Sequence, residues 1–131
     1  MCNTQQNASY LVENWLKNQG FRSARDEHGI LRFRYQGLDM VCPGDDDDPL
    51  FLRIVMPGIY SVKGDRAKVL EAISTICSKL KAIKAFLDDD GDLWLAIEMF
   101  VDSTPDIDDF VERCLDILVA GHRACAGEIL G

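Results

Sequence analysis

Two stretches of the sequence alternate between apolar and polar residues, and this pattern constrains the fold more than any other feature. In ILRFRYQ, residues 30–36, the leucine, phenylalanine and tyrosine share one face while Arg32 and Arg34 take the other. In LWLAIEMFV, residues 93–101, apolar residues again recur with a period of two. Successive side chains of a β-strand point to opposite faces, so both stretches predict strands with one face in the core.

The remaining segments give an order of helix, four strands, helix, two strands and helix. The expected helices are residues 9–19, 65–81 and 106–124, and the expected strands are 21–25, 30–36, 38–42, 49–57, 82–87 and 93–101. A cap at Ser103 or Thr104 and a proline at Pro105 suit the start of the last helix. Short turns pair neighbouring strands antiparallel, and the lack of βαβ alternation excludes a parallel Rossmann-type sheet. We therefore expect one α+β domain over residues 1–131, with an antiparallel β-sheet covered on one face by helices.

The acidic stretch DDDGD, residues 88–92, could be a metal-binding loop or the corner of a hairpin. Asp88, Asp90 and Asp92 alternate as in the first half of an EF-hand loop, but that loop needs glycine at position six and glutamate at position twelve. Here Leu93 and Met99 occupy those positions. Asp-Gly between two strand patterns is a favoured hairpin turn, and the sequence therefore predicts a turn.

A second acidic run, Asp45 to Asp48, is expected to be a solvated loop because adjacent carboxylates repel one another. No metal site is expected there or elsewhere. A small-molecule or metal-binding regulatory domain that uses these acidic loops remains the alternative function.

The histidines and cysteines show no catalytic or zinc-binding spacing. His28 is expected on the surface of a turn, and His122 near the end of the last helix, where a positive charge is favoured. The five cysteines are Cys2, Cys42, Cys77, Cys114 and Cys125. Without a CxxC pair they are expected to be reduced thiols, and the three central ones to be buried. A hydrolase with a cysteine nucleophile is a third hypothesis, but no motif supports it. We expect no enzyme activity, no catalytic residues and no cofactor.

The net charge of −8 argues against nucleic acid and anionic membranes as partners, because their phosphates would be repelled at long range. No apolar run is long enough to span a bilayer, and the first residues lack the pattern of a secretory signal. A cytoplasmic location is the resulting expectation.

The sheet face opposite the core is the candidate binding surface. The residues expected there as partner-binding side chains are Arg32, Arg34, Arg53, Lys84, Trp94 and Phe100. Arginine and tryptophan are enriched at interface hot spots, and large aromatic side chains are costly to leave in water. The alternative is a solvated face whose charges pair across strands.

The pattern also resembles a known group, the YbjN-like family, whose domain shares the fold of type III secretion chaperones. The similarity runs from about Tyr10 to Leu118. The features that carry it are the opening helix ending in NQGF, the DEHGILRFRYQG hairpin, the second helix, the KAFLDDDGDLWLAIEMF hairpin and the acidic-capped last helix.

This resemblance implies a small, acidic, cytoplasmic protein of bacterial type that binds a protein or peptide partner and can form a homodimer. Family members are labelled as proposed sensory-transduction regulators, with no reaction attached. The resemblance therefore implies a non-enzymatic protein-binding module, chaperone-like or regulatory, and it implies no catalytic residue.

Overall fold

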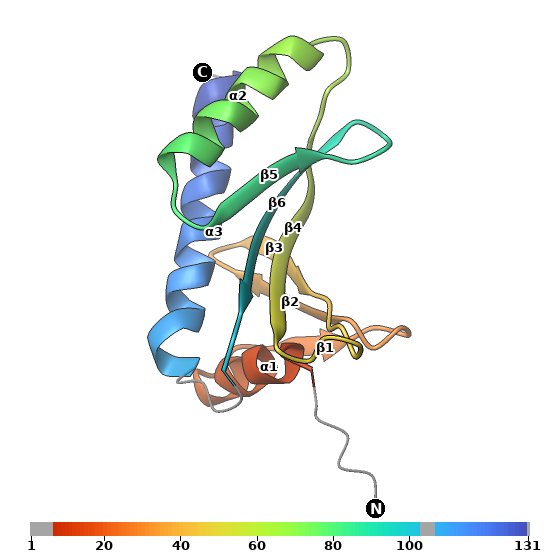
Figure 1. Cartoon of the computed structure of the whole chain (residues 1–131), viewed down its shortest axis with the longest axis vertical. Coiled ribbons are helices and arrows are strands. Elements are labelled where there is room, and N and C mark those ends of the chain that lie inside the picture. The colour runs from red at the N-terminus through yellow and green to blue at the C-terminus, as the bar shows by residue number, and fades with distance from the viewer. Residues whose placement is uncertain (1–6, 103–106, 131) are drawn as a thin grey trace, which may run out of the picture.

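The computed structural model describes residues 7–102 and 107–130, which form three helices and six strands in the predicted order (Figure 1). The helices are α1 (Ser9–Asn18), α2 (Arg66–Lys79) and α3 (Ile107–Leu130). The strands are β1 (Ser23–Arg25), β2 (Leu31–Tyr35), β3 (Leu38–Cys42), β4 (Phe51–Ser61), β5 (Ile83–Leu87) and β6 (Asp92–Phe100). The expected caps at Ser103, Thr104 and Pro105 lie outside the described residues.

The six strands form one antiparallel sheet in the order β1-β2-β3-β4-β6-β5. The first four strands follow one another as neighbours, and α2 then carries the chain across to the far edge. The β5–β6 hairpin closes the sheet by placing β6 beside β4. The predicted α+β class and the antiparallel sheet are confirmed.

The three helices cover the same face of the sheet (Figure 1). One hydrophobic core joins apolar side chains of α1, α2 and α3 to alternate residues of the strands. Its fully buried members include Leu16, Leu52, Ile54, Ile76, Leu93, Leu95, Ile97, Leu115 and Leu118. Among the described residues no helix is long and apolar enough to cross a membrane.

The first helix ends as its sequence predicts and is then fastened to β1. Gly20 has a φ of 82°, and the N–H of Phe21 donates to the carbonyl of Leu16, a left-handed helix end that glycine permits. Arg25 of β1 lies 2.9 Å from Glu13 of α1 and donates to the backbone carbonyl of Gly29. The Arg25 guanidinium therefore holds α1 against β1.

Two segments run further than the sequence patterns predicted. The expected strand end at Pro57 is wrong, because β4 continues to Ser61 with a shift of register between Met56 and Tyr60. Proline lacks an N–H and is tolerated at such a bulge, so it interrupts the ladder without ending the strand. The last helix continues to Leu130, and His122 consequently lies inside it and not near its end.

The sheet and α3 are also joined by a polar contact. The Tyr35 hydroxyl donates to the Asp116 carboxylate across 2.7 Å. Burial, and then the hydrogen bond to Asp116, raises the pKa of Tyr35 to about 12. The hydroxyl therefore stays protonated, and remains a donor, throughout the neutral range.

Gly121 lets α3 approach the sheet closely. A Cβ at this position would overlap Cδ1 of Ile83 and would lie 3.2 Å from Cδ1 of Leu95. Gly127 of the same helix has nothing within 4 Å of such an atom. The two glycines therefore lie on the same helix, but only Gly121 is tightly packed against the sheet.

We predict that Gly121→Val lowers the free energy of unfolding by about 1–3 kcal/mol, the usual cost of overfilling a packed core. Gly127→Val, the matched control, should leave it within about 0.5 kcal/mol because the site is open. Chemical denaturation followed by far-ultraviolet circular dichroism measures both. Equal stabilities of the two variants would contradict the close approach of α3.

Candidate functional site

The uncovered face of the sheet carries all six residues predicted as partner-binding. In an antiparallel pair, directly opposed residues share a face, so the register places each side chain. One row crosses five strands without a break: Arg32 is opposite Val41, Val41 is opposite Val55, Val55 is opposite Ala96, and Ala96 is opposite Lys84. Arg53 faces Glu98, Trp94 faces Phe86, and Phe100 faces Phe51 on the same side.

The six residues do not form one cluster, because a small apolar patch separates them. Val41, Val55 and Ala96 in the middle of the face are buried, although the three helices cover the opposite face of the sheet (Figure 1). Their cover includes Trp94 and other partly buried apolar side chains of the same face. The middle of the face is therefore packed largely by side chains of the face itself.

Trp94 is half-buried and held in place by the β5–β6 turn. Its ring lies 5.9 Å from that of Phe86, and its Nε1–H donates to Asp88 Oδ2 across 2.8 Å. The tryptophan expected to be a partner anchor is thus engaged within its own chain. The sequence did not predict this hydrogen bond, because an aspartate in a turn does not by itself indicate which side chain it will accept from.

The acidic stretch 88–92 is a hairpin turn, as predicted. Asp88 Oδ1 accepts the N–H groups of Asp90 and Asp92, and Gly91 takes a φ of 81°. The backbone N–H of Asp92 is the main cause of a lowered pKa at Asp88, and the Trp94 hydrogen bond adds to it. In the other acidic run, Asp45 Oδ1 accepts the N–H of Asp47. Among the described residues, no group of three or more His, Cys, Asp or Glu side chains is placed to hold a metal ion.

We predict that Asp88→Ala lowers the midpoint of chemical denaturation and increases the solvent exposure of Trp94, whereas Asp89→Ala changes neither. A carboxylate with a lowered pKa stabilises the fold above the ordinary carboxyl pKa, and this contribution is lost as the pH falls through the lowered value. The wild type should therefore lose stability on acidification more steeply than Asp88→Ala. Tryptophan fluorescence during denaturation at neutral and acidic pH measures both effects.

At one end of the face, Glu98 is shared by two cations. Glu98 Oε1 lies 3.2 Å from Lys84 Nζ, and Glu98 Oε2 lies 2.9 Å from Arg53 Nε. The buried Nε makes no hydrogen bond within the described part of the chain, so the second contact is an ion pair without hydrogen-bond geometry. Beyond this group Phe100 is 76% exposed and contacts Phe51 with ring centroids 5.6 Å apart.

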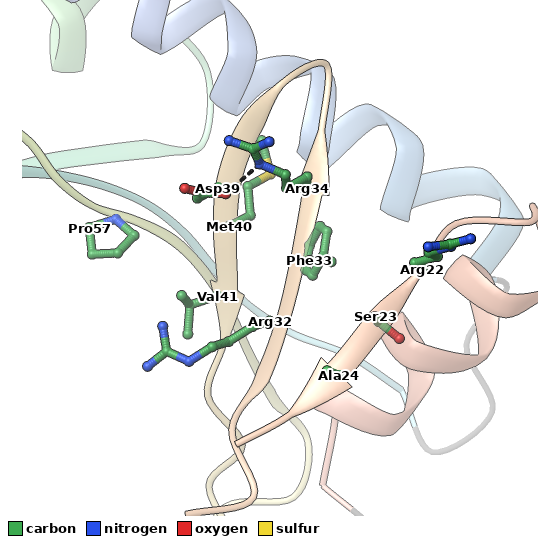
Figure 2. Close-up of a pocket in the computed structure, with 10 residues that line it drawn as sticks. All are labelled: Arg22, Ser23, Ala24, Arg32, Phe33, Arg34, Asp39, Met40, Val41 and Pro57. Atoms are coloured by element: carbon green, nitrogen blue, oxygen red, sulfur yellow. Dashed lines mark hydrogen bonds and ion pairs between the residues drawn. The ribbon is translucent and has the colours of Figure 1, made fainter. Parts of the chain in front are cut away.

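On the side of the face formed by β1, β2 and β3 lies a groove of about 860 Å³ (Figure 2). Its lining includes Arg22, Arg32 and Arg34, one acidic residue, Asp39, and the apolar side chains of Val41 and Pro57. Arg32 Nε lies 3.1 Å from Asp26 Oδ2, and Arg34 Nε lies 2.8 Å from Asp39 Oδ1. Sequence reasoning placed Arg32 and Arg34 on this face but did not foresee a groove, because its walls come from four separate strands.

The described cysteines are not arranged as nucleophiles. Burial raises the pKa of Cys42 to about 12 and those of Cys114 and Cys125 to about 11, whereas a reactive cysteine needs a lowered pKa. Cys77 was expected to be buried, and this is wrong. It is exposed beside edge strand β5, where its Sγ accepts the Ala85 N–H across 3.4 Å.

His122 and Cys125 line the same pocket of about 70 Å³ between α3 and β4. No hydrogen bond joins them, and the buried thiol carries the raised pKa described above. An activated pair would need the base in contact with a thiolate, so this pocket lacks the arrangement of a cysteine hydrolase. His28 is exposed in its turn, as predicted.

No model of a protein family matches the sequence, and no curated protein matches it either. Solved structures do match. YbjN from E. coli, described as a proposed transcription regulator, superposes with a TM-score of 0.67 at 15% identity, over 90% of this chain and 88% of its own. A chain of the ExoU–SpcU complex from the type III secretion system of Pseudomonas aeruginosa gives 0.67 at 23% identity, over 89% and 96%. The fold is that of YbjN and the type III secretion chaperones.

A second chaperone extends this agreement. SycH of Yersinia pestis, solved in complex with a fragment of YscM2, gives a TM-score of 0.55 at 15% identity, over 91% of this chain and 97% of its own. The shared architecture covers nearly the whole chain, as the sequence resemblance predicted. At these identities the likeness establishes the fold and carries over no individual residue.

Proposed function

We propose that this chain is a non-enzymatic protein-binding module, chaperone-like or regulatory, that acts in the cytoplasm and meets its partner through the uncovered face of the sheet. The observation that carries the proposal is the aromatic pair of exposed Phe100 and half-buried Phe51, on a face that also bears an arginine-lined groove. A few residues supply most of the binding energy at protein interfaces, and aromatic and arginine side chains are enriched there.

The structural neighbours support this proposal. SpcU is named in a heterodimeric complex with ExoU, and SycH in a complex with a fragment of YscM2, so the same fold holds protein partners elsewhere. One carboxylate oxygen of Asp88 and one of Asp45 accept backbone N–H groups of their own turns. The alternative of a small-molecule or metal-binding domain that uses these acidic loops therefore gains no support.

The test compares Phe100→Ala with Leu130→Ala. Both side chains are about equally exposed, at 76% and 73%, but Leu130 belongs to the helical layer. Proteins captured from a native lysate by the wild type are identified, and the affinity of the purified partner is then measured by calorimetric titration. We expect Phe100→Ala to weaken binding by about tenfold or more, the effect of a hot-spot aromatic, and Leu130→Ala to leave it unchanged. Equal affinities for both variants would exclude the aromatic pair, the observation that carries the proposal, from the interface.

Homodimerisation also remains a prediction, motivated by the resemblance. Sedimentation velocity at micromolar concentration should show a dimer of the wild-type chain. A monomer over the whole concentration range would refute it.

A further inference from the structure

The groove over β1, β2 and β3 is a basic site on an acidic protein. Three arginines line it, against Asp39 in the lining and Asp26 beside Arg32, whereas the whole chain carries a net charge of −8. Exposed charges act over about 8–10 Å at physiological salt, so a ligand in the groove senses the local arginines more than the distant carboxylates. The groove therefore attracts negative charge that the rest of the surface repels.

Arg32 and Arg34 are held so that their outer ends are presented to a ligand. Each is fixed through Nε, by Asp26 and by Asp39 respectively, and the terminal nitrogens make no hydrogen bond within the described residues. Figure 2 shows the Arg34 terminal nitrogens beyond the contact with Asp39, and the Arg32 guanidinium standing out from β2. The two side chains remain 57% and 72% exposed.

Arg25 of β1 is held differently, at all three of its guanidinium nitrogens. Its Nε and both terminal nitrogens donate within the fold, to Glu13, Ser9 and the Gly29 carbonyl. All the guanidinium nitrogens of an arginine in this chain can thus donate to contacts within the fold. Arg32 and Arg34 are each held at Nε alone, so their two terminal nitrogens remain as a planar pair of donors. Such a pair matches the two oxygens of a carboxylate.

The spacing of the two arginines selects an extended ligand. They occupy alternate positions of β2, so their Cα atoms lie about 6.7 Å apart along the strand and both side chains leave the same face. A peptide in β-conformation has the same repeat between alternate side chains. Two acidic residues separated by one residue can therefore meet both arginines at once, whereas adjacent acidic residues point to opposite sides.

We infer that this groove binds an extended acidic segment of the partner protein, with carboxylates at alternate positions paired end-on with Arg32 and Arg34. This inference rests on the proposed function and names the chemistry that the partner must present. The apolar side chains of Val41 and Pro57 in the lining offer contact to the rest of such a segment.

The test titrates the full chain with short peptides and follows backbone amide shifts by NMR, which detects weak binding. One peptide carries two glutamates separated by a serine, a permuted peptide carries them adjacent, and a third has lysines in their place. We expect the first to bind best, to shift residues of β1, β2 and β3, and to weaken as salt is added. Equal binding of the permuted peptide would overturn the spacing, and equal binding of the lysine peptide would overturn the charge.

Protein variants test the site itself. The double variant Arg32→Gln and Arg34→Gln should weaken peptide binding by about tenfold or more, since it removes two charge-assisted contacts. The matched control, Arg66→Gln with Arg123→Gln, removes the same charge from exposed positions on the helices and should change affinity by less than about twofold. Arg34→Lys keeps the charge but loses the paired donors, and should bind measurably more weakly than wild type.

Other outcomes separate this inference from the proposed function. Citrate binding as tightly as the peptide would assign the groove to small anions and overturn the inference. Self-association abolished by the double glutamine variant would assign it to the acidic loops of a second copy, which also overturns it. If no acidic peptide binds while Phe100→Ala still loses the captured partner, the inference fails and the protein-binding function stands.

Discussion

Each strand of this sheet has one face committed to the core, and the rest of the molecule follows from that commitment. Fully buried leucines and isoleucines on alternate positions of β4 and β6 pack under the helices. Because opposed residues share a face, the register that buries these side chains also sets Arg53 opposite Glu98 on the other side. A slip of one residue would exchange the two faces, so the core fixes the position of every residue on the candidate binding surface.

The uncovered face has a middle that is packed largely by its own side chains, and two more accessible regions beside it. Its central residues are sealed by Trp94 and other side chains of the face itself, and Trp94 is secured by Asp88. This arrangement lowers the cost of leaving a sheet face without a helix, because apolar area in the middle is removed from water. What remains for a partner is the aromatic pair of Phe100 and Phe51 and the arginine groove over β1, β2 and β3.

Charge has different effects at long and short range in this molecule. The net charge of −8 governs encounters at a distance and disfavours polyanions such as nucleic acid. Within the groove, the arrangement of individual guanidinium groups governs which ligand fits. Asp26 and Asp39 contribute by orienting Arg32 and Arg34, so part of the acidic character of the chain serves to build its basic site.

The sequence alone predicted the order of elements, the antiparallel sheet and the face of each candidate residue, because strand alternation and turn residues such as Gly91 act over a few neighbouring positions. It misplaced the end of β4 at Pro57, since a bulge is stabilised by the neighbouring strand and not by the proline's own neighbours. It likewise placed Cys77 in the core, although α2 turns that residue toward the edge of β5.

Only the tertiary structure decided how the surface residues combine. The groove needs residues from β1 to β4 beside one another, and the sharing of Glu98 by Arg53 and Lys84 needs β4, β6 and β5 side by side. Such groupings depend on contacts between residues far apart in the chain, whereas sequence periodicity reports only on near neighbours. The sequence therefore predicted which sheet face each residue lies on, but not which residues of that face come together as a site.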